Sequence, residues 1–120
     1  MPFYAQQVRY TEVGWAALVA SPENRLEAIR PTIERLGGTI VDGWFSFGDY
    51  DMLLICQLPD NMSAAALAMA VSAGGAIKSV KTTALLSLDE GVQAMSKAKS
   101  AEYKPPATEI PYFGTYRPAA

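Results

Sequence analysis

The sequence predicts an α+β protein in which two helices cover one face of a four-stranded antiparallel sheet. Three observations favour this fold. Segments typical of strands and helices follow one another in the order β, α, β, β, α, β; a short link joins two adjacent strands; and the helical segments carry apolar or small residues that suit packing on a sheet. Two interlocked right-handed βαβ units of this order make a ferredoxin-like sandwich. A chain of 120 residues has the length of one such domain.

The first strand is expected over residues 3–10, where aromatic and extended-favouring types predominate without a helical stripe. Gln6 and Gln7 are the polar exceptions in this strand. A helix is then expected to begin at Thr11, because its hydroxyl group can accept a hydrogen bond from a backbone amide of the first turn.

A second helix is expected to begin at residues 21–22, because serine is a favoured capping residue and proline suits the first helical position. Its apolar residues recur at three- and four-residue spacing as far as the two glycines at 37–38, which end it. Pro31 lies inside this pattern. Because proline lacks a backbone N–H and its ring crowds the preceding turn, we expect a kink or a break near Arg30.

A β-hairpin is expected next. Residues 39–47 and 51–58 are rich in β-branched, aromatic and aliphatic types, and residues 48–50 form a link short enough for an antiparallel pair. The alanine-rich stretch at 60–73 begins with three capping types and ends before two glycines, so it predicts a helix. Residues 76–86 predict the last strand of the sheet.

The rest of the chain is expected to add a short helix and an extended arm. Ser87 and Glu90 have the spacing of a capping box, and nearby lysines suit the carboxyl end of a helix. We therefore divide the chain into a domain at 1–100 and an arm at 101–120. Aromatic residues favour an arm laid over the domain or its partner, the alternative being a disordered tail. They are Tyr103, Tyr112, Phe113 and Tyr116.

The strand at 51–58 indicates self-association, because it is apolar on both alternating sets of side chains. Leu53 and Ile55 fall on one side, whereas Met52, Leu54 and Cys56 fall on the other. Two helices cover only one face of the predicted sheet. Leaving several hundred Å² of apolar surface in water on the other face would forfeit on the order of 10 kcal/mol. A homodimer, or a higher homo-oligomer, with sheets packed face to face removes that loss.

Composition excludes several classes of function. The net charge is −2 and the ten basic residues are scattered, so no basic stripe is available for nucleic acid. No stretch approaches the ~20 apolar residues that cross a bilayer, and we expect a cytoplasmic protein without membrane contact. Cys56, the single cysteine, is expected to be a buried, inert thiol. Because histidine is absent, histidine-based acid and base chemistry is excluded, and neither a metal nor a cofactor is expected.

The segments "ERLGG", "FGDYD" and "PD", with the strand and helix that they flank, resemble the GYD-domain family over residues 3 to about 90. The family is named for a glycine, a tyrosine and an aspartate that match Gly48, Tyr50 and Asp51 here. The resemblance implies a small α+β protein related to the dimeric α+β barrels, and it implies little about activity. This sequence departs from the family pattern at Pro31 and at Gln6 and Gln7.

The turn at 48–51 is the first candidate site. In an extended segment Asp49 and Asp51 point the same way and Tyr50 points the opposite way, so two carboxylates gather on one side. Such a pair can hold a proton or a hard cation. Alternatively, the aspartates only accept hydrogen bonds from the backbone amides of a tight hairpin. Asp51 and Tyr50 are the candidate catalytic residues of the first interpretation.

Polar residues on the strands supply the other candidates. A polar side chain between packed sheets is costly unless it is paired, so any that faces inward there marks a pocket or a buried ion pair. Arg9, paired with Asp51, Trp44 as an aromatic platform, and Lys81 are the candidate ligand-binding residues. The remaining polar positions are Gln6, Gln7, Tyr10, Lys78, Ser79, Thr82 and Thr83.

Three functional hypotheses follow from the sequence. The first is a homo-oligomeric protein that binds a small apolar or aromatic molecule, or serves as an assembly module, without catalysis. The second is a cofactor-independent isomerase or monooxygenase-like enzyme with Asp51, Tyr50 and Arg9 in a pocket inside the barrel. The third is a structural subunit that uses the arm at 101–120 to join dimers.

Overall fold

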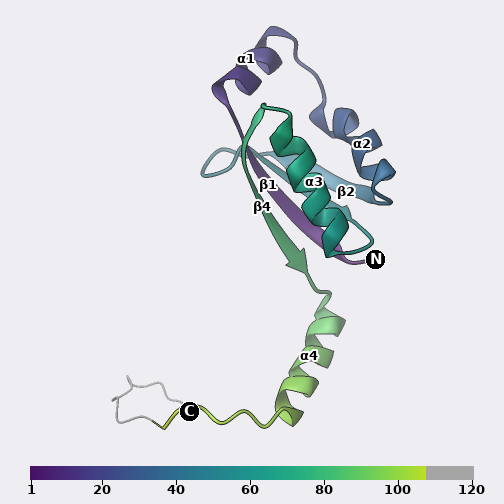
Figure 1. Ribbon diagram of the computed structural model, residues 1–120, viewed down its shortest axis with the longest axis vertical. Helices are drawn as coiled ribbons and strands as arrows, with labels where there is room; N and C mark the ends of the chain where they lie inside the picture. Colours follow the sequence, from purple (N-terminus) through teal and green to yellow (C-terminus); the bar gives the residue numbers. More distant parts are fainter. Residues whose placement is uncertain (108–120) are drawn as a thin grey trace. The chain divides into compact units, whose positions relative to one another are not determined.

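The structure is a computed structural model that describes residues 1–107, shown in Figure 1, and it divides into two units. The first unit, Met1–Leu86, contains β1 (Phe3–Tyr10), α1 (Glu12–Ala20), α2 (Arg25–Arg35), β2 (Thr39–Phe45), β3 (Met52–Gln57), α3 (Asn61–Ala73) and β4 (Ile77–Leu85). The second unit begins at Ser87 and contains α4 (Leu88–Ser100). The predicted domain boundary at residue 100 stays a prediction.

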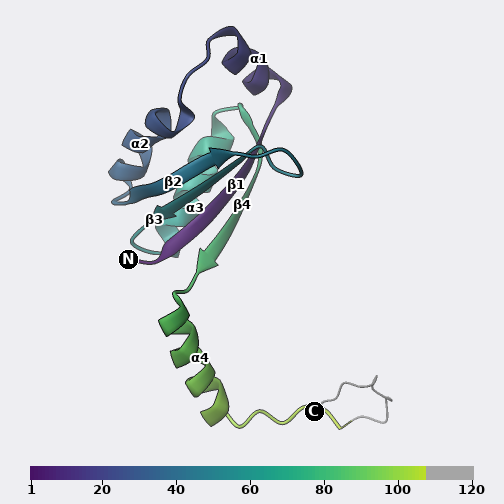
Figure 2. The ribbon, with the colours of Figure 1, turned by 180° about the vertical axis from the view of Figure 1, so that it is seen from behind.

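The first unit confirms the predicted α+β, ferredoxin-like fold. Its four strands form one antiparallel sheet in the order β2-β3-β1-β4, so β1 and β3 lie in the centre. Helices α2 and α3 pack on one face of this sheet, which we call the covered face (Figure 1). Seen from behind, the sheet has no helix of this unit in front of it (Figure 2), and we call this the open face.

The register of the strands decides which side chains lie on each face. Leu54 of β3 pairs with Gln6 of β1, and both are buried under the helices, whereas the neighbouring pair of Leu53 and Gln7 lies on the open face. A β-bulge interrupts β2, since Ile40 pairs with Cys56 and Asp42 with Ile55, which leaves Val41 unpaired.

The predicted hairpin is confirmed, although its connection is longer than expected. Strands β2 and β3 are joined by residues 46–51 rather than by 48–50 alone. The backbone amide of Ser46 donates to the carbonyl oxygen of Asp51 at 2.9 Å, and the Ser46 hydroxyl donates to the carbonyl of Tyr50 at 2.7 Å. These bonds close the loop at its base.

Helix α1 begins at the predicted Thr11, whose side chain accepts a hydrogen bond from the amide of Gly14 at 3.0 Å. The Thr11 amide donates to the carbonyl oxygen of Ala76 at 2.9 Å, so the helix start is tied to the segment before β4. A Cβ atom on Gly14 would lie 2.5 Å from the same oxygen. Only glycine therefore allows this close approach at the first turn of α1.

The structure corrects the expected start of α2 and excludes a break near Arg30, while the alternative of a kink there stays a prediction. The helix begins at Arg25, not at residues 21–22, because the side chain of Asn24 accepts from the amide of Leu26 at 2.9 Å and Ser21 instead ends α1. The helix also continues through Pro31 to Arg35 without a break. Pro31 is exposed, and the same helix buries Ile33 completely, so packing on the sheet outweighs the lost backbone hydrogen bond.

The last two helices begin as predicted. Asp60 caps α3 by accepting a hydrogen bond from the Ser63 amide at 2.8 Å, which lowers the pKa of its carboxyl group. Ser87 and Glu90 form a reciprocal capping box at the start of α4, with distances of 3.0 and 2.8 Å. Residues 102–107 form neither helix nor strand. The remainder of the predicted arm, with Tyr112, Phe113 and Tyr116, lies outside the described residues.

The core lies between the covered face and the two helices. Strands contribute Tyr4, Leu54 and Cys56, and these side chains are at most 3% exposed. The prediction for Cys56 is confirmed, because its thiol is free and fully buried, and burial raises its pKa to about 11. The rest of the core is formed by Ile33, Leu58, Ala64 and Leu67. None of the helices within residues 1–107 is long and apolar enough to cross a membrane.

Candidate functional site

A cavity of about 330 Å³ lies between the covered face of the sheet and helices α2 and α3. Alternation along β1 directs Gln6, Val8 and Tyr10 into it. Arg25 is the one charged residue among the described residues that line it. Most of the remaining lining is aliphatic, as supplied by Ile29, Met52, Leu54, Leu67, Val71, Ile77 and Val80.

Gln6 is the most unusual residue of this cavity, because a polar side chain that is only 3% exposed lies in an apolar layer. Its Oε1 atom accepts a hydrogen bond from the Thr82 hydroxyl at 2.6 Å. Its Nε2 atom has no partner, and it is the only such buried side-chain atom in the described part of the chain. An unpaired buried donor costs about 1–3 kcal/mol, so Gln6, a residue that lines the cavity, retains one unused hydrogen-bond donor.

Tyr10 and Arg25 supply further donors. Tyr10 is 6% exposed, and its hydroxyl group has only a weak partner, the Met52 sulfur atom at 3.6 Å. Burial raises the pKa of Tyr10, an effect that the nearby Arg25 guanidinium partly opposes, so the phenol is neutral at neutral pH. Trp15 meets the Tyr10 ring edge-on, with the two ring centroids 5.1 Å apart. Arg25 forms an ion pair with Glu23.

Asp51, a candidate catalytic residue, is bound to the backbone of β1. Its Oδ2 atom accepts from the Tyr10 amide at 2.9 Å, and its own amide donates to the Val8 carbonyl at 2.8 Å. These bonds are those of the structural interpretation, in which a hairpin aspartate satisfies backbone amides. Asp51 does not line the cavity. No ion pair joins it to Arg9 within residues 1–107.

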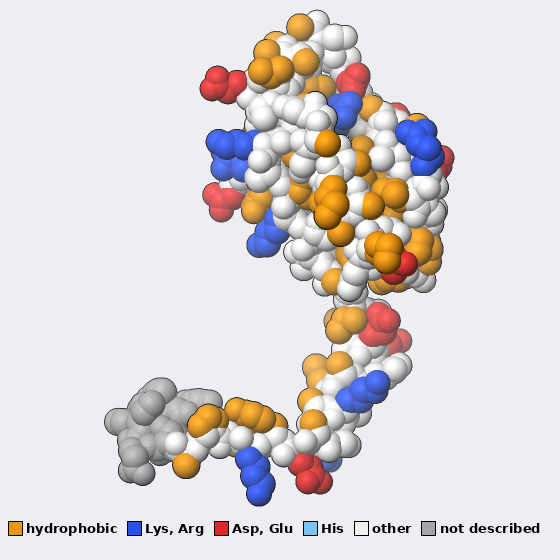
Figure 3. All heavy atoms as spheres, viewed as in Figure 1, with side chains coloured by type: hydrophobic (Ala, Val, Ile, Leu, Met, Phe, Trp, Pro, Cys, Tyr) orange, Lys and Arg blue, Asp and Glu red, His pale blue; other side chains and the backbone are white. Residues whose placement is uncertain are grey.

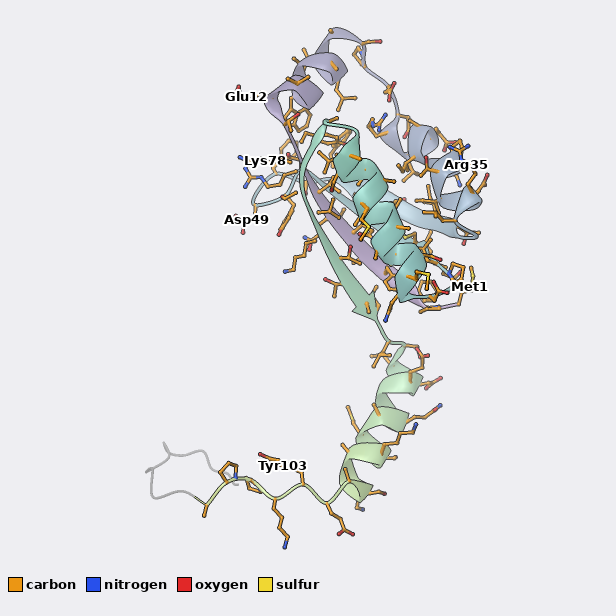
Figure 4. The ribbon with its side chains drawn as sticks, viewed as in Figure 1. Met1, Glu12, Arg35, Asp49, Lys78 and Tyr103 are labelled. Carbon is orange, nitrogen blue, oxygen red and sulfur yellow. The ribbon has the colours of Figure 1, made fainter. Side chains whose placement is uncertain are left out.

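The second candidate catalytic residue, Tyr50, lies at the base of the β2–β3 loop, where its carbonyl oxygen accepts from the Ser46 hydroxyl. Together with Gln7 and Lys81 it lines a shallow hollow of about 320 Å³. Asp49 also lines this hollow, on the loop that projects away from the helices (Figure 4). Tyr50 and Lys81 are thus brought together, although on the surface and apart from the cavity under α2 and α3.

The three candidate ligand-binding residues all belong to the open face. Trp44 pairs with Leu53, Leu53 with Gln7, and Gln7 with Lys81, so these four side chains form one row across the sheet. Arg9 lies one step along β1, in register with Ser79. Trp44 is 53% exposed. The open face therefore gathers Arg9, Trp44 and Lys81, and their binding role stays a prediction.

The residues that line the cavity were only partly foreseen from the sequence. Gln6 and Tyr10 were among the polar strand positions considered for a pocket, but that pocket was expected between packed sheets, whereas both side chains face the helices. Arg25 was missed, because the helix start was placed before it. Its signal was Asn24, a favoured capping residue directly ahead of the apolar stripe. In the described part of the chain, no group of three potential metal-ligating side chains comes together.

Comparisons with known proteins identify the family. Neither the comparison with curated proteins nor that with solved structures found a match. The family model for the GYD domain matches residues 4–95, which include all four strands except the first residue of β1, and the loop at residues 46–51. That range agrees with the resemblance carried by Gly48, Tyr50 and Asp51. The chain therefore belongs to the GYD domain family.

Proposed function

We propose that this protein binds a small apolar molecule, without catalysis, in the cavity between the covered face of the sheet and helices α2 and α3. The observation that carries the proposal is the unpaired Nε2 atom of Gln6, a buried residue that lines a largely aliphatic cavity. A protein that needed only a stable core would place an aliphatic side chain there, because such a side chain leaves no donor unpaired.

The size of the cavity suits this function. Its 330 Å³ falls within the range of about 300–1,000 Å³ typical of small-molecule pockets. Water, at about 30 Å³ per molecule in the liquid, would need on the order of ten molecules to fill it, each with polar partners. The aliphatic lining offers few such partners. An organic molecule with an apolar body fits this environment better than water does.

The chemistry of the lining favours binding over catalysis. Among the described residues that line the cavity there is no aspartate, glutamate or cysteine to act as a base or nucleophile. Tyr10 is neutral and serves as a hydrogen-bond donor. The alternative, a cofactor-independent isomerase or monooxygenase-like enzyme, would have to use Asp51 and Tyr50 elsewhere, and the Asp51 carboxylate already accepts from the Tyr10 backbone amide.

The test is to fill the cavity from α3. Ala68 is half-buried and lines the cavity, whereas Ala73, near the end of the same helix, is exposed and does not. The probe is N-phenyl-1-naphthylamine, an uncharged apolar dye whose fluorescence rises in apolar surroundings. We expect saturable binding to the natural protein, loss of at least about tenfold in affinity for Ala68→Phe, and no change for Ala73→Phe. Absence of saturable binding, or equal loss in both variants, would refute the proposal.

We further propose that a second copy of the chain covers the open face, giving a homodimer with its two sheets face to face. The support is the exposure of large apolar side chains on that face: Trp44 is 53% and Phe3 39% exposed, and Leu53 and Ile55 are partly exposed. Apolar patches of this kind mark association surfaces. Two sheets stacked about 10 Å apart would bury all four side chains.

Sedimentation velocity tests the dimer directly. Ile55→Lys puts a charge in the centre of the open face and is expected to give a monomer at concentrations where the natural protein is dimeric. Met62→Lys is the matched control, since Met62 is 80% exposed on α3, over which hydrophobic side chains are visible in Figure 3. A natural protein that sediments as a monomer at micromolar concentration would contradict this proposal without affecting the one on ligand binding.

A further inference from the structure

We infer that the ligand of the cavity is a small organic acid: an apolar body whose carboxylate is held by Arg25 and Tyr10 and whose carbonyl oxygen, farther inside, is held by Gln6. The inference rests on the proposed binding function and specifies the chemistry of the ligand. It is argued from the two polar regions of the cavity and from the aliphatic wall between them.

The inner region requires a hydrogen-bond acceptor. Gln6 lies on a central strand between Leu54 and Thr82, and its Oε1 atom is already bonded to the Thr82 hydroxyl. The bond that remains to be made is from Nε2, which can only donate. The ligand atom at this point must therefore be an acceptor, and a carbonyl oxygen is the acceptor that an apolar body most readily carries.

The outer region requires an anion. Arg25 is the single charged residue among the described residues of the lining, and its side chain is 31% exposed, so it lies where the cavity meets solvent. A guanidinium group has five N–H donors, and Glu23 engages only its Nη1 atom. The Tyr10 hydroxyl, with only the Met52 sulfur at 3.6 Å as partner, is a second donor beside it. Two adjacent donors, one of them charged, form a carboxylate site.

The spacing of the two regions gives the length of the ligand. Gln6 and Tyr10 are four residues apart on β1 and point the same way, so their Cα atoms are about 13 Å apart at ~3.3 Å per residue. Val8 lies between them and also lines the cavity. The ligand body is therefore apolar and extends along β1, with its two oxygen functions separated by this aliphatic stretch.

The experiment uses three compounds of nearly identical shape. 4′-Acetylbiphenyl-4-carboxylate carries both functions at opposite ends of two rings, 4′-ethylbiphenyl-4-carboxylate replaces the carbonyl oxygen by two hydrogens, and 4-acetyl-4′-methylbiphenyl replaces the carboxylate by a methyl group. Affinities are measured by isothermal titration calorimetry on the natural full-length chain. We expect the loss of the carboxylate to weaken binding roughly tenfold or more, and the loss of the carbonyl oxygen to weaken it about three- to tenfold.

Variants then assign each difference to its residue. Gln6→Leu should abolish the preference for the acetyl over the ethyl compound and raise the urea midpoint of unfolding, because it removes an unpaired buried donor. Arg25→Gln should abolish the preference for the acid over the methyl compound. Arg30→Gln is the matched control, since Arg30 lies on the same helix, pairs with Glu27 and is absent from the lining. Circular dichroism checks that each variant is folded.

The outcomes separate the inference from the function on which it rests. If the naphthylamine dye binds and Ala68→Phe abolishes its binding, but the three compounds bind equally or not at all, the inference is overturned and the binding function stands. The inference is also overturned if Gln6→Leu and Arg25→Gln keep both preferences. If neither the dye nor any of the compounds binds, both proposals fail.

Discussion

The two faces of the sheet differ far more in their surroundings than in their sequence. On β3, Leu54 and Cys56 point to the covered face and are at most 3% exposed, whereas Leu53 and Ile55 point to the open face and are only half-buried. The two sets are almost equally apolar. Both faces of the sheet are therefore apolar, but the helices of the first unit pack on only one of them, and the other face is left open (Figure 2).

The polar residues of the two faces also differ in their surroundings. Arg9 and Lys81 on the open face are exposed, whereas Gln6 on the covered face is buried with one donor unpaired. A charge that stays in water costs little free energy, but an unpaired amide in a core reduces stability. Among the described residues, the covered face thus combines the buried core with the one side chain that keeps an unpaired buried donor, and that residue lines the cavity.

The largest expected effect is a difference in stability between alanine variants of two adjacent leucines, one on each face of the sheet. Leu54→Ala should lower the free energy of unfolding by about 2–5 kcal/mol, because it removes packing in the core. Leu53→Ala should lower it by about 1 kcal/mol or less in dilute solution, where the open face is wet. Urea unfolding at low and high protein concentration measures both. If the open face is an interface, the gap between the two variants narrows as the concentration rises; equal losses in dilute solution would mean that the two faces do not differ.

A second test uses the buried thiol of the covered face. Burial raises the pKa of Cys56 from the ordinary 9.0 to about 11, so the folded state resists ionisation that the unfolded state accepts. The associated stability is complete below about pH 9 and is lost as the pH rises toward 11, by up to about 3 kcal/mol.

Chemical denaturation between pH 7 and 11 detects this loss as a difference between the natural protein and Cys56→Ala. The free energy of unfolding of the variant should decline less with rising pH, because it lacks the thiol. All other groups that titrate at alkaline pH are present in both proteins. Parallel declines in the two proteins would show that the thiol ionises equally well in the folded state.

The smallest expected effect compares two threonines of β4. Thr82 donates to Gln6 on the covered face, whereas Thr83 pairs with Ala5 on the open face. Thr82→Val should cost about 1 kcal/mol, because it leaves the Gln6 Oε1 atom without its partner. Thr83→Val should be close to neutral, since valine suits a strand and no described hydrogen bond of the Thr83 side chain is lost. Thermal unfolding of the two variants distinguishes them, and identical melting temperatures would argue against the Thr82–Gln6 bond.

The sequence predicted the parts of the fold that depend on local signals. Thr11, Asp60 and Ser87 cap their helices as expected, because each needs only its own side chain and the first turn that follows. The start of α2 was misplaced, since Ser21 and Asn24 are both capping types and local sequence does not rank them. Pro31 was expected to kink or break the helix, and no break occurs, because the burial of Ile33 on the sheet outweighs the lost hydrogen bond.

The alternation of side chains in the sequence did not allow us to predict which residues of β2 face the helices. Counting by twos from Ile40, which lies over the core, would put Trp44 on the covered face. The bulge at Val41 shifts the phase, so Phe45 faces the helices, with its ring 6.2 Å from that of Trp15, and Trp44 is left on the open face. The cavity was equally hidden, because the surroundings of Gln6 are set by Thr82, 76 residues away.

The same bulge gives β2 a tolerance in length. Since Val41 has no partner, deletion of this residue would give a straighter strand in which Asp42 still pairs with Ile55 and Trp44 with Leu53. Deletion of one residue farther along, inside the regular ladder, would instead move the following side chains to the opposite face of the sheet. Homologues and engineered versions are therefore free to differ by one residue at this point while keeping the same inner and outer surfaces.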